Sequence, residues 1–251
     1  MNVISVSNRK GGIGKTTVSI NVARELVQRG YLVLMVDLDS QCDLSDIYTK
    51  GYRAKRGEIL KLLEGKDQIA SGESVVEIMD NLYLIPGSRD LMHLDANIEA
   101  DRLKNILSDE YLEEVEYVII DHPPNINEAA LQGFVASDYV IMPLEPEALC
   151  MDNIESLLYD LELIQQEMNP DMELLGMVLN RIDKRRGLTE RMIARLEKAF
   201  GDYLFRARIS NNTAIPTSMA DRVALRDLHW RSKTVSQFQK LVSEIEERIG
   251  D

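Results

Sequence analysis

The sequence of 251 residues predicts a doubly wound α/β fold, in which a mostly parallel sheet has helices on both faces. Two observations support this prediction. Apolar strand-like runs alternate with helical patterns along the chain, and most of these runs are continuously apolar, as in strands that are buried on both faces. Because 45% of the residues are hydrophobic and no long linker occurs, we expect residues 1–251 to form one domain.

The first three elements form a βαβ unit. Residues 3–7 are apolar and β-branched and end at a glycine-rich turn, which predicts a buried strand. Residues 15–28 place apolar side chains at helical spacing, and Gly30 ends this helix. Residues 32–39 form a second apolar run that ends in carboxylates, and residues 49–72 are polar and predict short helices.

The alternation continues toward the end of the sequence. Further strands are predicted at residues 82–86, 117–121, 139–144 and 174–180. Helical patterns cover residues 90–107, 127–136 and 152–168. Residues 234–251 have apolar side chains on one face, which predicts a closing helix packed on the sheet. Its acidic end is unsuited to an anionic membrane surface, so we expect no membrane binding.

Hydropathy and cysteine content restrict where the protein works. No apolar run reaches the length of about 18 residues that spans a membrane, and the chain begins directly with a strand, so we expect a soluble, cytoplasmic protein. Cys42 and Cys150 lie far apart and match no metal or redox spacing, so we expect two buried free thiols.

The charge is unevenly distributed along the chain. The formal net charge is -13, which alone argues against nucleic-acid binding. Residues 1–180, however, contain 14 Lys and Arg against 32 Asp and Glu, whereas residues 181–233 contain 13 against 6. One basic segment therefore lies in an otherwise acidic protein, and both a solvated helical face and a nucleic-acid contact are consistent with it.

The stretch NRKGGIGKTT, residues 8–17, lies between the first strand and the first helix and predicts a phosphate-binding loop. Backbone amides of such a loop converge on phosphate oxygens at the positive end of the following helix. Lys15 supplies charge for the β- and γ-phosphates, the Thr16 hydroxyl suits Mg²⁺, and Thr17 lies near the α-phosphate. The expected nucleotide contacts are Lys10, Gly11, Gly12, Ile13, Gly14, Lys15, Thr16 and Thr17.

Lys10 departs from the common loop pattern. Arg9 occupies the position where G-x-x-x-x-G-K-[ST] has its first glycine, and Lys10 follows it. A lysine at the mouth of the loop can point out of the site, toward a second subunit. KGGIGKTT resembles the deviant Walker A motif of the ParA/MinD ATPases, and the resemblance extends from Met1 to about Glu247. It implies ATP and Mg²⁺ as ligands, and a dimer in which Lys10 reaches the phosphates of the partner's ATP.

Three carboxylates end predicted strands at the edge where ligands of doubly wound sheets bind. The resemblance implies that Asp39 polarises the attacking water and that Asp37 supports the Mg²⁺ and the loop. Asp121 resembles the Walker B aspartate, which holds the Mg²⁺ through water, and Ser40 stands where the family usually has proline. His122 has no partner at ligand spacing and is interpreted as structural. The implied metal residues are Thr16, Asp37 and Asp121, and the implied catalytic residues are Lys10, Lys15 and Asp39.

Two further segments resemble the family's base-binding region. Asn180 ends the strand in LNRID and is implied to contact the adenine, with turn chemistry as the other explanation. In RISNNTAIP, the backbone from Ile209 to Asn211 is implied to line the base pocket. In ParA-type partition ATPases, basic residues of the C-terminal third bind DNA phosphates without reading bases. The corresponding candidates are Lys184, Arg185, Arg186, Arg206, Arg208, Arg222, Arg226, Arg231 and Lys233.

We interpret the sequence as a ParA-like ATPase of plasmid or chromosome partition. ATP would drive a homodimer that binds nonspecific double-stranded DNA on the nucleoid, and hydrolysis stimulated by a ParB-like partner would release it. A MinD-like spatial-positioning ATPase, acting on a membrane or protein cargo, is the alternative, and the membrane version needs a basic amphipathic tail. A metal or cluster carrier needs paired cysteines, and Asp39 and Asp121 argue against a binding module that does not hydrolyse ATP.

Overall fold

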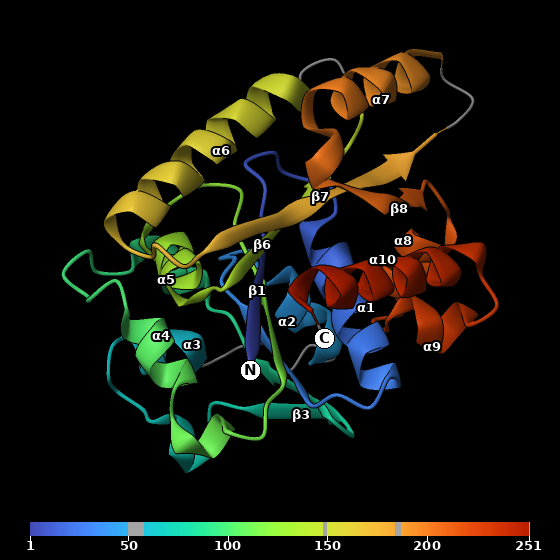
Figure 1. The fold of residues 1–251 in the computed structure, drawn as a ribbon. Helices are drawn as coiled ribbons and strands as arrows, with labels where there is room; N and C mark the ends of the chain where they lie inside the picture. The colour runs from blue at the N-terminus through green and yellow to red at the C-terminus, as the bar shows by residue number, and fades with distance from the viewer. Residues whose placement is uncertain (50–57, 148–149, 184–186, 251) are drawn as a thin grey trace.

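The computed structural model describes residues 1–49, 58–147, 150–183 and 187–250. Its centre is one eight-stranded sheet with the strand order β3-β4-β2-β5-β1-β6-β7-β8. Helices surround this sheet (Figure 1). Among the described strands, β3 runs antiparallel to β4, and every other neighbouring pair is parallel. The predicted doubly wound fold with a mostly parallel sheet is confirmed.

The elements follow one another in the alternating order that the sequence predicts. The strands are β1 (Asn2–Val6), β2 (Val33–Asp37), β3 (Val76–Met79), β4 (Leu82–Ile85), β5 (Tyr117–Asp121), β6 (Tyr139–Leu144), β7 (Glu173–Ile182) and β8 (Leu204–Ser210). The described α-helices are α1 (Lys15–Gln28), α2 (Asp43–Tyr48), α3 (Glu58–Leu63), α4 (Arg102–Leu107), α5 (Glu128–Ala136), α6 (Cys150–Glu167), α7 (Gly187–Phe200), α8 (Ala214–Ala220), α9 (Leu225–His229) and α10 (Lys233–Ile249). The described 3₁₀ helices are η1 (Ile69–Ser71), η2 (Arg89–His93), η3 (Glu110–Leu112) and η4 (Gly201–Tyr203).

Helices cover both faces of the sheet because its strands alternate their side chains between two sides. In β5, Tyr117 and Ile119 pack in the core that includes α1 and α10, whereas Val118 and Ile120 pack in the core that includes α3 and α4. A third cluster joins β6 and β7 to α5, α6 and α7. The central strands are therefore buried on both faces, which explains their continuously apolar sequences.

α10 closes one face of the sheet and also covers its edge at β8. Phe238 and Leu241 are fully buried in the core, which confirms the predicted closing helix. The Glu244 carboxylate accepts the backbone N–H groups of Arg206 at 2.6 Å and of Ala207 at 2.8 Å. Unpaired N–H groups on an edge strand tend to pair with other chains, and Glu244 satisfies two of those groups on β8.

The helix predicted over residues 90–107 is wrong. The structure has η2 at the start of this range and α4 at its end, with a turn at Asp95 between them. The Asp95 carboxylate accepts the backbone N–H of Asn97 at 2.9 Å, and such local bonds compete with helix formation. The Gln132 side chain from α5 accepts the N–H of Leu103 at 2.9 Å and so fixes the first turn of α4.

Cys42 and Cys150 are both buried free thiols, as the sequence predicts. Burial raises the pKa of the Cys42 thiol to about 12, so this group stays protonated at neutral pH. No helix in the described ranges is long and apolar enough to cross a membrane.

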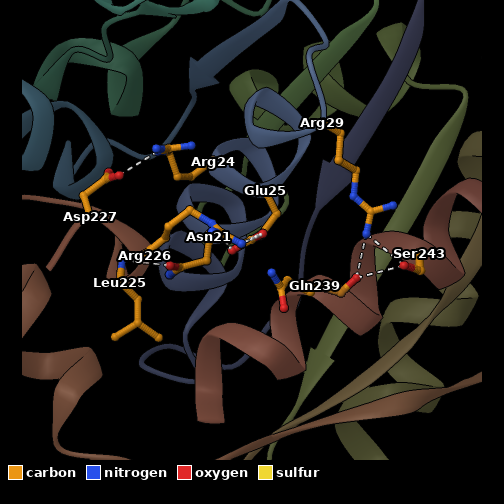
Figure 2. A network of polar contacts seen from close by, with 9 residues as sticks. All are labelled: Asn21, Arg24, Glu25, Arg29, Leu225, Arg226, Asp227, Gln239 and Ser243. Carbon is orange, nitrogen blue, oxygen red and sulfur yellow. Dashed lines mark hydrogen bonds and ion pairs between the residues drawn. The ribbon is translucent and has the colours of Figure 1, made fainter. Parts of the chain in front are cut away.

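Polar contacts attach α9 to α1, the helix that follows the predicted phosphate loop (Figure 2). The Arg226 guanidinium donates to both carboxylate oxygens of Glu25, at 2.8 and 2.6 Å, and this ion pair is largely buried. Asn21 accepts the backbone N–H of Leu225 at 3.0 Å and donates to the Thr17 carbonyl at 2.8 Å. α9 is thus fixed directly to the middle of α1, at Asn21 and Glu25.

Replacing Arg226 by alanine is expected to lower the free energy of unfolding by about 3 kcal/mol, because Glu25 would become a buried charge without a partner. The double variant Glu25→Leu, Arg226→Met removes both charges and should recover most of this loss. Urea unfolding followed by circular dichroism measures both variants. Arg206→Ala is the control, since it removes exposed ion pairs and should cost less than about 1 kcal/mol. An Arg226→Ala protein as stable as this control would contradict the structural role of the buried pair.

Candidate functional site

The carboxyl ends of the parallel strands β1, β2, β5 and β7 lie at one edge of the sheet, where the loop after β1 leads into α1. Gly12 and Gly14 in this loop have φ angles of 74° and 93°, a left-handed conformation that favours glycine. A Cβ on Gly14 would lie 2.5 Å from Nδ2 of Asn180, so a larger residue would also clash there. The tight turn of the loop therefore depends on glycine.

The first turn of α1 contacts Asp121 at the end of β5. Thr16 Oγ1 donates to Asp121 Oδ2 at 2.7 Å, and Ser19 Oγ donates to Asp121 Oδ1 at 3.0 Å. The structure thus brings together Thr16 and Asp121, two of the residues that the sequence predicts for Mg²⁺. Sequence reasoning misses Ser19, although it lies one helical turn after Thr16 on the same face.

Lys15 is buried beside this carboxylate. Burial lowers the pKa of its ammonium group, whereas the nearby charges of Asp121 and Asp39 raise it. Asp39 is half-buried, and its Oδ1 accepts the backbone N–H of Gln41 at 2.9 Å. An ammonium group and two carboxylates placed in this way suit an anionic phosphate that binds together with a divalent cation.

Asp37, at the end of β2, pairs in register with Asp121 at the end of β5. Its Oδ2 accepts the backbone N–H and the hydroxyl of Ser45, at 2.9 and 2.6 Å, and its Oδ1 accepts the N–H of Asp39 at 3.1 Å. Complete burial, together with the charge of Asp121, raises the pKa of Asp37 to about 8. These contacts hold the loop after β2 in place, while the support of Mg²⁺ by Asp37 stays a prediction.

The buried carboxylate of Asp121 makes stability depend on pH. Burial raises its pKa from 3.8 to about 7, although the bonds from Thr16 and Ser19 act in the opposite direction. The folded chain therefore binds more protons than the unfolded chain between about pH 4 and about pH 7. Without nucleotide, its free energy of unfolding is expected to fall as the pH rises through this window.

Asp121→Asn is expected to remove much of this pH dependence, because the uncharged amide can accept one hydroxyl at its oxygen and donate its NH2 group to the oxygen of the other. Urea unfolding at about pH 5 and about pH 8, without nucleotide, should differ less in the variant, which should also be more stable than the parent at the higher pH. Asp202→Asn, at an exposed position, is the control and should follow the parent. If the parent and Asp121→Asn lose stability in parallel, Asp121 is not the cause.

Lys10 lies at the mouth of the loop, apart from Lys15. Its ammonium group forms an ion pair with Glu147 in the segment after β6, and 36% of its side chain is exposed. Its backbone N–H donates to Asn8 Oδ1 at 2.9 Å, and Asn8 Nδ2 donates to the Pro143 carbonyl at 2.9 Å. Lys10 thereby lines a pocket of about 350 Å³ together with Asn8 and Glu147. The two lysines of the loop have separate positions and separate partners.

Asn180 lies at the end of β7, against the loop. Its Nδ2 donates to the Ile13 carbonyl at 2.7 Å, and its Oδ1 accepts the next backbone N–H at 2.9 Å. The structure shows that Asn180 holds the loop, and its contact with adenine stays a prediction. At the end of the neighbouring strand β8, the side chain of Ile209 is buried, and the N–H of Asn211 donates to the Ile182 carbonyl at 3.0 Å.

His122 is buried and structural, as predicted. Its Nε2 lies 2.6 Å from Ser5 Oγ, and its ring packs on Phe134 with the centroids 4.3 Å apart. Burial lowers its pKa to about 3, so the ring is neutral at physiological pH. Within the described ranges, no three His, Cys, Asp or Glu side chains are placed to hold a metal by themselves. Mg²⁺ usually takes one or two protein ligands together with substrate phosphates, and Thr16 and Asp121 fit that pattern.

The described basic residues that the sequence suggests for DNA differ in their contacts. Arg226 is bound to the buried Glu25, which gives it a structural role, while its contact with DNA stays a prediction. Arg206 and Arg208, on β8, form ion pairs with glutamates of α10 and α7. Arg222 is exposed and lines a groove beside the start of α1. Outside the described residues lie Lys184, Arg185 and Arg186.

The fold and the loop define a P-loop nucleotide-binding protein, in which a glycine-rich loop joins β1 to α1 and an aspartate ends the adjacent strand β5. Residues 1–174 match the family model AAA_31, described as an AAA domain. The chromosome-partitioning ATPase Soj of Thermus thermophilus is 29% identical over 250 residues, which cover 99% of this chain and 96% of Soj. The chain belongs to the ParA/MinD family, as a ParA-type P-loop ATPase, and the resemblance seen in the sequence is confirmed.

Solved structures agree with this assignment. A Borrelia burgdorferi plasmid partition protein bound to AMPPNP has a TM-score of 0.84 at 20% identity, over 98% of this chain and 99% of that chain, and it supports the fold. Cobyrinic acid a,c-diamide synthase from Mycobacterium smegmatis, with bound ATP analog and magnesium, has a TM-score of 0.82 at 25% identity, over 97% of this chain and 93% of that chain. Proteins with this architecture thus bind ATP analogues and magnesium.

Proposed function

We propose that this chain is an ATP-driven switch of DNA partition. ATP and Mg²⁺ bind at the loop, the ATP-bound chain forms a homodimer through Lys10, and the dimer binds nonspecific double-stranded DNA. Hydrolysis, stimulated by a DNA-bound ParB-like protein, opens the dimer and releases the DNA. The observation that supports this proposal most is the separation of the two loop lysines, with Lys15 buried beside Asp121 and Lys10 exposed at the loop mouth.

In the proposed mechanism, the loop amides and the ammonium group of Lys15 orient the β- and γ-phosphates. Thr16 and Asp121 would hold a Mg²⁺ ion, which when bound would offset the negative charge of the phosphate oxygens. Asp39 orients the attacking water in line with the bond that breaks. Asp37 keeps the loop after β2 in place, and with it Asp39, whose N–H it accepts.

Lys10 is proposed to act on the nucleotide of the neighbouring subunit. Its ion pair with Glu147 is exposed, and such pairs are worth about 1 kcal/mol or less, so Lys10 can leave Glu147 for the phosphates of a partner's ATP. In a twofold-symmetric dimer, each subunit presents the same lysine to the other. ADP lacks the γ-phosphate and is expected to hold the dimer less well.

The MinD-like alternative in its membrane form is not favoured by this structure. The apolar face of α10 is packed in the core and is not available to enter a lipid surface, and its last turns include Glu246 and Glu247. We therefore propose a single P-loop ATPase domain that works in the cytoplasm in association with the nucleoid.

DNA binding in each nucleotide state tests the proposed function. A short fluorescent duplex of arbitrary sequence is titrated with the parent protein holding ADP and with the Asp39→Ala variant holding ATP, across a salt series. We expect binding in the ATP state alone, with an affinity that falls steeply with salt because phosphate contacts release counterions. Equal binding in both states, or no binding by a demonstrably ATP-loaded dimer, would contradict the proposal.

A further inference from the structure

The outer face of α7 has three basic residues in line that the sequence analysis does not single out. The inner face of this helix is buried in the core with β6 and β7. We call the exposed residues Arg191, Arg195 and Lys198 the α7 stripe. Their spacings of four and three residues place them on the same side of the helix, one turn apart.

The charges of the α7 stripe have no acidic partner among the residues that the structure describes. Of the acidic side chains of α7, Glu197 pairs with Arg208 on β8, and Glu190 lines the pocket between α7 and α10. An incoming phosphate can therefore bind the stripe without displacing a carboxylate. At Arg206 and Arg208 it would first have to break an existing ion pair.

The dimensions of the α7 stripe suit a regular polyanion. An α-helix rises 1.5 Å per residue, so the stripe extends about 10 Å from Arg191 to Lys198. Phosphates of one DNA strand follow each other at about 3.4 Å along the axis, so about three of them lie beside the stripe. Among the described side chains of α7, the one large apolar residue that is exposed is Leu188, which offers little area for burial in a lipid surface.

We infer that the α7 stripe, rather than the ion-paired arginines of β8, binds the phosphate backbone of DNA. The inference rests on the proposed DNA-binding function and names the surface that performs it. α7 follows β7, whose Asn180 holds the phosphate loop at the Ile13 carbonyl. The α7 stripe therefore lies on the helix that directly follows the strand in contact with the phosphate loop.

The test compares two double variants that remove equal charge. Arg191→Ala, Arg195→Ala removes two residues of the stripe, and Lys66→Ala, Lys104→Ala removes two exposed lysines near the helices that cover β2, β4 and β5. Both sets are made in the Asp39→Ala protein loaded with ATP, and binding to a short fluorescent duplex of arbitrary sequence is measured by anisotropy across a salt series. Circular dichroism and ATP binding show that each variant is folded.

We expect the stripe variant to bind DNA about tenfold or more weakly, with a slope of log K against log salt that is smaller by about 0.9 for each phosphate that the protein no longer binds. The lysine control and the variant Arg206→Ala, Arg208→Ala should stay within about twofold of the parent. If the parent binds DNA and the stripe variant binds equally well, this inference is wrong and the proposed function stands. If the ATP-loaded parent does not bind DNA at all, both are wrong.

Vesicles of anionic lipid test whether the α7 stripe binds a membrane surface instead of DNA. Phosphatidylglycerol vesicles share negative charge with DNA but lack its regular spacing of phosphates. We expect the parent and the stripe variant to float equally little with them. Vesicle binding that disappears in the stripe variant, with DNA binding unchanged, would overturn the assignment of the stripe to DNA.

Discussion

Lys10→Ala is expected to abolish ATP-dependent dimerisation while the monomer still binds ATP. The structure gives the two loop lysines different surroundings, since Lys15 is buried against Asp121 whereas Lys10 pairs with Glu147 at the loop mouth. Removing Lys10 therefore leaves the phosphate cradle of its own chain intact. Sedimentation velocity with saturating ATP measures the dimer, and equilibrium binding of a fluorescent ATP analogue measures the monomer's affinity.

Arg9→Ala is the matched control for this experiment. Arg9 is the neighbouring cation at the loop mouth, and its guanidinium is directed at α6, where it contacts Asp160 at 3.0 Å and the hydroxyl of Ser156. The proposed switch assigns Arg9 no contact with the nucleotide of a second subunit. This variant should dimerise with ATP much as the parent does. If the Lys10→Ala protein dimerises with ATP as well as the Arg9→Ala protein does, Lys10 is not needed for the dimer and this prediction is wrong.

Asp39→Ala is expected to slow ATP hydrolysis by about a hundredfold or more, because the loss of a group that orients and polarises the attacking water typically costs that much. ATP binding should be retained, since Lys15 and the loop amides are unchanged. The ATP-bound dimer should therefore accumulate. Single-turnover hydrolysis of radiolabelled ATP, with and without DNA, measures the rate of the chemical step.

Asp43→Ala provides the comparison for Asp39→Ala. Asp43 is an exposed carboxylate four residues further along the same loop, at the start of α2. Asp43→Ala removes one negative charge, as Asp39→Ala does, but it leaves the Asp39 carboxylate near Lys15 in place. Similar losses of rate in the two variants would show that charge in this loop, and not the position of Asp39, controls hydrolysis.

The central strands could be predicted from the sequence because burial on both faces makes them continuously apolar. β8 is missed for the opposite reason. It lies at the sheet edge, where exposed Arg206 and Arg208 alternate with buried Phe205 and Ala207, and the alternation hides the strand among basic residues. β3 is the other edge strand, and none of its four residues is buried, so it lacks the apolar signal of a central strand. α7 has a sequence signal that the charge pattern overshadows, because Met192, Ile193 and Leu196 lie at helical spacing and are buried while the charged residues occupy the opposite face.

The site could be predicted where a contiguous motif fixes the geometry. The glycine-rich loop, Thr16 and Asp121 come together as the motif indicates. The contacts made by Ser45 and Asn8 could not be predicted, because they depend on how separate loops pack at the strand ends. The ion pair that holds Arg226 is likewise a tertiary contact, so the charge pattern of the sequence alone could not show the structural role of this residue.

Mixing Lys10→Ala protein with Asp39→Ala protein is the most direct test of the central claim, that Lys10 acts on the ATP of a second subunit. Each protein alone is expected to hydrolyse ATP very slowly. In a mixed dimer, the Lys10→Ala subunit keeps Asp39 and receives Lys10 from its partner, so one site is complete.

Random pairing of equal amounts into twofold dimers would give about a quarter of the parent's ATPase rate per chain. Because Asp39→Ala chains also dimerise with each other and a mixed dimer keeps one Lys10 contact, we expect a measurable recovery with this value as its upper limit, and an excess of Lys10→Ala protein should increase it. A mixture no more active than its two components would contradict the action of Lys10 between subunits and, with it, the proposed switch.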